Sequence, residues 1–256
     1  MDSKKLLKMA LDVMSESEKC TAYAAALLAE ITAEIESQTP AATPNKVIFY
    51  SESAWIDDLL VNKQGGFEHQ GTGILGRNEI GLRECSVLNI NTSVEQSAAY
   101  LFYWKQLPNP TYVYSCDYFI PSSTKPGSWW NIMQWKSTYD GNTDNSWPIV
   151  CLDVASDMSL RIFHKPTVDD HNVKPYLSGI KVPTGRWFTL SAEYRKDQIN
   201  GCVSVYLDGK QIFYIPIIKT TLSDNTLYWS VNNYAGDGGP NPRSLYVSRM
   251  KIEAQK

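Results

Sequence analysis

Long apolar runs, metal-ligand spacings and an excess of charge are all missing from this sequence of 256 residues. No apolar stretch is long enough to span a membrane. Lys8 and Asp12 interrupt the first 14 residues, so these do not form a signal peptide, and we expect the protein to accumulate in the cytosol of the cell that makes it. The net charge of −3 argues against nucleic acid as a partner.

The five cysteines also lack the patterns that carry chemistry. They occur singly, with no C-x-x-C pair and no histidine at metal-ligand spacing, which excludes a zinc-site pattern. A dispersed odd number does not describe a secreted disulfide scaffold, so we expect buried free thiols.

Aromatic residues, by contrast, are abundant. Eight Trp, fifteen Tyr and seven Phe in a chain of moderate charge favour β sheets over a helical bundle. The first 38 residues differ, because Leu7, Leu11, Leu28 and Ile31 belong to a helical spacing of three and four. A stripe this narrow must pack on the rest of the chain, on a copy of itself or on another protein.

Two prolines in residues 39–46 indicate a linker, after which the hydrophobic period changes to two. We therefore divide the chain into a helical segment (1–38), a linker (39–46) and an all-β domain (47–256). Asp208-Gly209 is a strong hairpin signal. The expected strands are Val47–Tyr50, Cys85–Thr92, Ala98–Lys105, Thr111–Ile120, Trp129–Thr138, Ile149–Val154, Ser159–His164, Trp187–Arg195, Cys202–Leu207, Gln211–Ile215, Leu227–Asn232 and Ser244–Ile252.

So many strands without intervening helices predict a two-sheet antiparallel sandwich or jelly roll. The strand Trp129–Thr138 carries the functional prediction. Strict alternation puts Trp129, Asn131, Met133 and Trp135 on the core face, and Trp130, Ile132, Gln134 and Lys136 on the opposite face. An indole beside an amide and an ammonium suits a sugar, which offers an apolar face and a polar rim. Trp130, Gln134, Lys136 and Tyr234 are the predicted glycan-binding residues.

Several segments, in order, resemble the heparin-lyase-like polysaccharide lyase family. They are Tyr118–Pro121, Trp129–Lys136, Val182–Phe188, Gly201–Gly209, Val231–Tyr234 and Ser244–Val247. The resemblance covers roughly Tyr112–Glu253 and implies the concanavalin A-like jelly roll. Lyases of this family cleave uronic-acid polymers by β-elimination, which needs a carboxylate neutraliser, a base and an acid.

The resemblance also implies catalytic candidates. Gln134 stands where the family neutralises the sugar carboxylate, and Lys136 stands where a histidine base is often found. His164 and Tyr234 are the candidates for base and acid from other strands. A lysine in a polar surround stays protonated at neutral pH, so the polar loops expected around this strand favour binding without turnover.

Asp140, Asn142 and Asp144 have the alternate spacing with which a calcium loop begins, but the later ligands of such a loop are missing. A solvated turn is the alternative, and no other cofactor is indicated.

The first functional interpretation is a non-catalytic glycan-binding jelly roll. Its N-terminal helix would attach it to an oligomer or a particle, such as a phage or other virion surface. The alternatives are a polysaccharide lyase acting on uronic-acid polymers and a purely structural virion decoration protein.

Overall fold

The structure, a computed structural model, describes residues 45–54, 67–70, 73–90, 97–103, 106–127, 129–140, 146–167, 175–222, 226–236 and 240–255. Residues 45–256 form one unit by themselves. The predicted helix and most of the predicted linker lie outside the described residues. No helix in the described ranges is long and apolar enough to cross a membrane.

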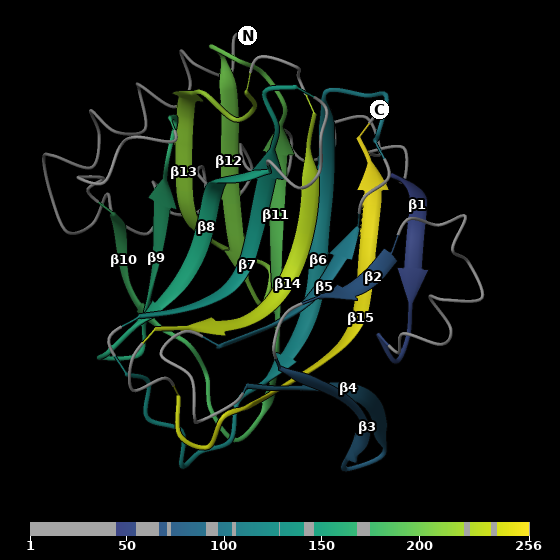
Figure 1. The fold of residues 1–256 in the computed structure, drawn as a ribbon, viewed down its shortest axis with the longest axis vertical. Helices are drawn as coiled ribbons and strands as arrows, with labels where there is room; N and C mark the ends of the chain where they lie inside the picture. Colours follow the sequence, from purple (N-terminus) through teal and green to yellow (C-terminus); the bar gives the residue numbers. More distant parts are fainter. Residues whose placement is uncertain are drawn as a thin grey trace, which may run out of the picture. The chain divides into compact units, whose positions relative to one another are not determined.

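Two antiparallel sheets make up the domain, as the sequence predicts (Figure 1). The eight-stranded sheet contains β1 (Lys46–Ser51), β3 (Ile74–Ile80), β4 (Arg83–Asn89), β6 (Thr111–Phe119), β11 (Trp187–Arg195), β12 (Gly201–Leu207), β13 (Lys210–Ile218) and β15 (Ser244–Ala254). The seven-stranded sheet contains β2 (Phe67–Gln70), β5 (Ser97–Tyr103), β7 (Trp129–Ser137), β8 (Trp147–Ala155), β9 (Ser159–His164), β10 (Tyr176–Lys181) and β14 (Tyr228–Ala235).

The order of strands is β13-β12-β11-β6-β15-β4-β3 in the first sheet, with β1 beside β15, and β10-β9-β8-β7-β14-β5-β2 in the second. Strand β7 therefore lies near the middle of its sheet, between β8 and β14. The residues of β7 that face away from the other sheet have neighbours on both sides, which is the position that a binding groove needs.

Aromatic side chains fill the space between the sheets. Trp135 of β7 stacks on Tyr194 of β11 with ring centroids 4.8 Å apart, and Tyr114 of β6 meets Trp135 edge to face at 5.8 Å. Trp130 and Trp135 are both fully buried. Such contacts add about 0.5–1.5 kcal/mol per pair beyond the area they bury, so these rings fix how the two sheets pack.

The turn between β12 and β13 confirms the predicted hairpin. Asp208 and Gly209 have φ values of 49° and 79°, as a two-residue turn of the favoured hand requires. Three strands escaped prediction: β2, β3 and β10 are at or near sheet edges, where polar residues interrupt the alternation.

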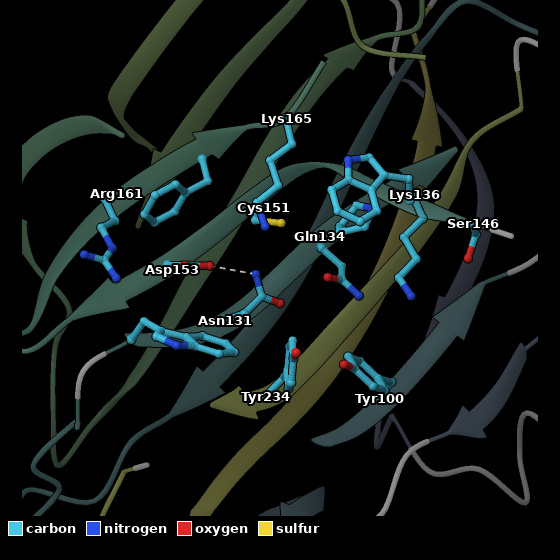
Figure 2. Close-up of a pocket in the computed structure, with 14 residues that line it drawn as sticks. Tyr100, Asn131, Gln134, Lys136, Ser146, Cys151, Asp153, Arg161, Lys165 and Tyr234 are labelled. Carbon is cyan, nitrogen blue, oxygen red and sulfur yellow. Dashed lines mark hydrogen bonds between the residues drawn. The ribbon is translucent and has the colours of Figure 1, made fainter. Parts of the chain in front are cut away.

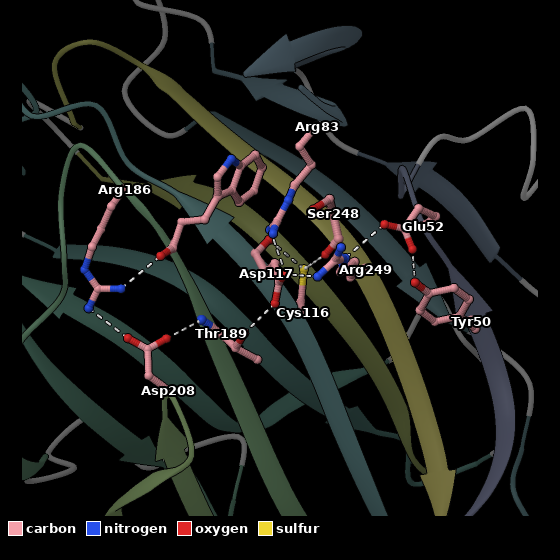
Figure 3. A network of polar contacts seen from close by, with 11 residues as sticks. Tyr50, Glu52, Arg83, Cys116, Asp117, Arg186, Thr189, Asp208, Ser248 and Arg249 are labelled. Atoms are coloured by element: carbon pink, nitrogen blue, oxygen red, sulfur yellow. Dashed lines mark hydrogen bonds and ion pairs between the residues drawn. The ribbon is translucent and has the colours of Figure 1, made fainter. Parts of the chain in front are cut away.

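A chain of polar contacts crosses the outer face of the eight-stranded sheet (Figure 3). Its centre is the buried carboxylate of Asp117 on β6, which lies 2.7 Å from Nη1 of Arg83 and accepts a hydrogen bond of 2.6 Å from Oγ1 of Thr189. Arg249, on β15, pairs with Glu52 at 2.9 Å. These contacts tie four strands and the end of β1 together on the outer face of this sheet.

Candidate functional site

A groove of about 620 Å³ crosses the outer face of the seven-stranded sheet (Figure 2). Strands β5, β7, β8, β9 and β14 contribute its walls and floor. Gln134, Lys136 and Tyr234, three of the residues predicted from the sequence, all line it. The fold thus brings together two of the predicted residues on β7 and one on β14.

The fourth predicted residue, Trp130, does not line the groove. It is fully buried in the core, and its Nε1 donates a hydrogen bond of 2.8 Å to Asn233. The prediction that Trp130 shares a face with Gln134 and Lys136 is therefore wrong, whereas Trp135 lies in the core as predicted.

A β-bulge explains the error. On β7, Asn131 pairs with Asp153 while Met133 pairs with the very next residue of β8, Leu152, so Ile132 is an extra residue. Both Ile132 and Met133 point into the core. The alternation is displaced by one position at this point, so Trp129 and Asn131 share the groove with Gln134 and Lys136.

Trp129 supplies the indole that the sequence assigns to Trp130. Its ring meets Tyr234 of β14 edge to face, with centroids 4.8 Å apart. It also lies directly on the backbone of Gly236, where an added Cβ would be 2.4 Å from Nε1 of Trp129. Tyr234 in turn contacts Tyr100 of β5 at 5.6 Å. These three rings form an aromatic wall against which the apolar face of a sugar can stack.

Asn131 is fully engaged by the protein. Its Nδ2 donates to Oδ1 of Asp153 at 2.8 Å, and its Oδ1 accepts a hydrogen bond from Asn232. Since both ends of the amide are used within the sheet, Asn131 stabilises the floor of the groove and has no amide group left to bind a ligand.

Gln134 differs from Asn131 in this respect. Its side chain is 2% exposed, and among the described residues its Nε2 has no hydrogen-bond partner. Its cross-strand neighbour Ser230 has an unpartnered buried hydroxyl as well. Buried polar groups are almost always paired, so this part of the floor is made for a ligand or for ordered water.

Lys136 lies against aromatic rings. Its Nζ is 5.0 Å from the centroid of the Phe102 ring and 5.7 Å from that of Tyr100. Burial lowers the pKa of the ammonium, because the surroundings disfavour the charged form. The expectation that the pKa of Lys136 is not lowered is therefore wrong, while most of the loop after β7, residues 141–145, lies outside the described residues.

Two further cations, Arg161 and Lys165, line the groove from the region of β9. Asp153 is the one carboxylate among the described residues that line it. Burial raises the pKa of Asp153, while the hydrogen bond from Asn131 and the charges of Arg161 and Lys165 act in the opposite direction. Nearby Cys151 stays a neutral thiol, because burial raises its pKa to about 12.

The structure places His164 away from the groove. Its neighbours Phe163 and Lys165 line the groove, so strand alternation turns His164 to the other face. There its Nε2 lies 2.6 Å from the backbone oxygen of Lys219, and burial lowers its pKa. His164 is not placed to act with Gln134 and Tyr234.

The proposed calcium loop is described only in part, since Asn142 and Asp144 lie outside the described residues and only Asp140 is included. Within the described ranges, no group of three His, Cys, Asp or Glu side chains could hold a metal ion. Calcium binding stays a prediction.

Most residues of the groove escaped the sequence analysis, among them Tyr100, Trp129, Arg161 and Lys165. Residues Leu160 and Ile162 alternate with Arg161 and Phe163, as in an ordinary amphipathic strand. This alternation alone could have placed Arg161 on the face away from the core. Trp129 could not be found in this way, because only the bulge assigns it to the groove.

The fold and the groove together define a jelly roll with a ligand groove across one sheet. The family model for polysaccharide lyases matches residues 85–251, which is more than half of the chain. The chain belongs to the polysaccharide lyase family. No curated protein sequence matches it.

Solved structures with the same fold come from several sources. The endo-β-1,4-glucuronan lyase of the fungus Trichoderma reesei has a TM-score of 0.62 at 12% identity, over 82% of this chain and 96% of that one. The alginate lyase vAL-1 of Chlorella virus has a TM-score of 0.62 at 10% identity, over 81% and 99%. A carbohydrate esterase of the Shiga toxin-encoding bacteriophage phi24B has a TM-score of 0.54 at 11% identity, over 83% and 100%. At these identities the similarity shows the fold alone.

Proposed function

We propose that the groove binds an acidic polysaccharide and cleaves it by β-elimination at a uronic acid unit. The observation that carries the proposal is the presence on one strand of two groups: Gln134, whose buried amide nitrogen has no partner among the described residues, and Lys136, a half-buried lysine of lowered pKa. Family membership, and the lyase names of two structural relatives, support the same reaction class.

The charge of the groove favours an anionic ligand. Lys136, Arg161 and Lys165 line it, and the described part of the chain gives none of them an ion-pair partner. Among the described residues the one carboxylate that lines the groove, Asp153, is buried and accepts a hydrogen bond from Asn131. A groove with unpaired cations, in a chain of net charge −3, concentrates negative charge locally.

Each group required by an elimination has a candidate in the groove. The amide of Gln134 donates to the uronate carboxylate, which makes the neighbouring carbon–hydrogen bond more acidic. The neutral amine of Lys136 takes that proton. The electron pair forms a carbon–carbon double bond as the bond to the leaving glycosidic oxygen breaks, and the phenol of Tyr234 donates a proton to that oxygen.

The pKa directions fit these two roles. Burial lowers the pKa of Lys136, which increases the fraction of neutral amine able to accept a proton. Burial raises the pKa of Tyr234, which keeps its phenol protonated and able to act as an acid. Turnover should therefore rise with pH through the pKa of Lys136 and fall only above that of Tyr234.

Glycan binding without turnover is the second candidate. The contact of Lys136 with the faces of Tyr100 and Phe102 favours it, because an aromatic face stabilises an ammonium ion and opposes the loss of its proton. In that case Lys136 would bind the carboxylate as a cation.

Attachment belongs to the proposal too. We retain the hypothesis that residues 3–37 join the domain to an oligomer or a larger particle, with a virion surface as one such particle. The groove argues against a purely structural decoration role. Cations without ion-pair partners among the described residues are expected where an anionic ligand binds, and a purely structural protein binds none.

The test is to incubate the protein with alginate, glucuronan, heparin and hyaluronan and to follow the ultraviolet absorbance of the unsaturated product. We expect turnover on at least one polymer, and its loss in Gln134→Ala, Lys136→Gln and Tyr234→Phe. Gln211→Ala and Tyr214→Phe, at exposed positions of β13, are the matched controls and should keep wild-type rates. Binding without any product would establish the second candidate instead.

A further inference from the structure

Arg161 lies at the end of the groove remote from Lys136. Figure 2 shows it on the opposite side, with Asp153, Asn131 and Gln134 between the two cations. Arg161 is on β9 and pairs across the strands with Asp153 of β8, whereas Gln134 is on β7. The proposed elimination uses neither Arg161 nor its neighbour Lys165.

The guanidinium of Arg161 is held in place by an aromatic ring, but one of its donors has no hydrogen-bond partner among the described residues. Its Cζ is 4.8 Å from the centroid of the Phe163 ring, a contact that fixes the plane of the group. Its Nε is buried and has no hydrogen-bond partner among the described residues. Asp153, the carboxylate on the neighbouring strand, makes no ion pair with it and instead accepts a hydrogen bond from Asn131. A buried donor left unpaired costs free energy that a ligand oxygen can recover.

Lys165 adds a second positive charge on the β9 side of the groove, between Arg161 and Lys136 (Figure 2). It follows β9 directly, and its Nζ lies 5.6 Å from the centroid of the Trp147 ring. The charges of Arg161 and Lys165 both act on Asp153 and oppose the rise in its pKa that burial causes. The β9 side of the groove therefore contains one planar fork of donors and one point charge.

The spacing separates this end from the reacting centre. Neighbouring strands are ~4.8 Å apart, so two strand steps from β7 to β9 span ~10 Å, which is longer than a single pyranose ring. Since this is the spacing of the strand backbones, we expect an acidic group bound at Arg161 to belong to a different sugar unit from the one held by Gln134.

We propose that Arg161, assisted by Lys165, forms a second acid-binding subsite that recognises the carboxylate of a neighbouring uronic acid unit. The inference rests on the proposed function and deepens it. The ligand it defines is a chain with acidic groups on more than one unit, not a neutral polymer with an isolated uronate. A carboxylate is the group expected, because its two coplanar oxygens match the guanidinium fork.

The test compares short and long ligands. Calorimetric titrations would use uronic acid disaccharide and tetrasaccharide in a Tyr234→Phe background, so that the ligands survive. We expect the tetrasaccharide to bind more tightly than the disaccharide. Arg161→Gln should remove roughly tenfold or more of the tetrasaccharide affinity while leaving the disaccharide nearly unchanged. Arg161→Lys should lie between. Arg186→Gln, which changes an exposed arginine on the other sheet, is the matched control.

Other outcomes decide against the subsite. Equal weakening of both ligands in Arg161→Gln, or no weakening, overturns it. A tetrasaccharide with sulfate groups in place of its carboxylates should lose most of the gain in affinity, and retention of that gain would overturn the choice of carboxylate. Gln134→Ala tests the underlying function separately, since it should weaken ligands of both lengths. If the background protein binds neither ligand, the proposed function fails and the subsite with it.

Discussion

Trp129 and Trp130 are neighbours in the chain with opposite surroundings. Trp130 is fully buried and hydrogen-bonded to Asn233, while Trp129 lines the groove beside Tyr234. We expect Trp130→Ala to lower the free energy of unfolding by about 3–5 kcal/mol, because it leaves a large cavity. Trp129→Ala should cost little stability but weaken glycan binding about tenfold or more, since it removes an aromatic stacking surface.

Thermal denaturation and ligand titration of the two variants check this pair of expectations. Trp135→Ala is the control for a buried indole and should behave like Trp130→Ala. A similar fall in melting temperature for Trp129→Ala and Trp130→Ala would contradict the assignment of Trp129 to the groove and Trp130 to the core.

Asp153 should oppose folding at neutral pH. Burial raises its pKa above the usual 3.8, so folding takes up a proton in the window between 3.8 and the raised value. The wild type loses stability as the pH rises through that window and does not regain it above. Asp153→Asn removes this loss and can still accept the hydrogen bond from Asn131. We therefore expect the variant to be more stable than the wild type at pH 7, by an amount that shrinks toward pH 4.

Asp157 provides a control of opposite sign. Hydrogen bonds from Ser159 lower the pKa of this exposed carboxyl group, so its contribution is present above the unfolded pKa of 3.8 and is lost as the pH falls through the lower folded value. Asp157→Asn should be less stable than the wild type at neutral pH. Melting curves between pH 4 and 8 measure both differences, and an Asp153→Asn protein that is less stable at pH 7 would contradict the burial argument.

At the scale of elements, the bulge in β7 determines what the sequence could and could not predict. Periodicity identified most strands, and the run from Trp187 to Arg195 was bounded correctly, because regular pairing obeys a period of two. The same rule misplaced Trp130, because Ile132 is an extra residue in the pairing with β8. Bulges depend on contacts between strands and leave little trace in one strand's sequence. The unpartnered state of Arg161 is equally a property of the assembled sheet.

The polar contacts on the far face of the eight-stranded sheet should contribute measurably to stability. Asp117→Asn removes the charge that pairs with Arg83, whose side chain is 25% exposed. Because solvent screens this pair in part, we expect a loss of about 1–3 kcal/mol in the free energy of unfolding. Denaturant unfolding measures it.

Glu84→Gln is the comparison for that change. The side chains of Arg77 and Glu84, which pair with each other, are 52% and 61% exposed. The free energy of unfolding of the variant should therefore stay within about 0.5 kcal/mol of the wild-type value. Activity in the groove should be unaffected by either substitution, since the network lies on the other sheet. A loss of turnover in Asp117→Asn at unchanged stability would show that the two faces are coupled.

At the scale of the whole molecule, residues 45–256 should fold without the segment that precedes them. Both sheets are completed within this range, and β1 begins at Lys46. We expect the shortened protein to keep its sheet signal in circular dichroism and its activity in the groove. Light scattering should show that it no longer assembles, if residues 3–37 are the attachment segment. Loss of the sheet signal would mean that those residues belong to the core.

The central claim is that this member of the polysaccharide lyase family cleaves an acidic polysaccharide by elimination. The mass spectrum of the products, taken after incubation of a defined oligouronate with the protein in water enriched in heavy oxygen, tests it most directly. Elimination predicts one fragment lighter than a hydrolysis product by one water, with no heavy oxygen in either fragment. Two results would contradict it: every candidate polymer and oligouronate stays intact after prolonged incubation, or the fragments have incorporated heavy oxygen.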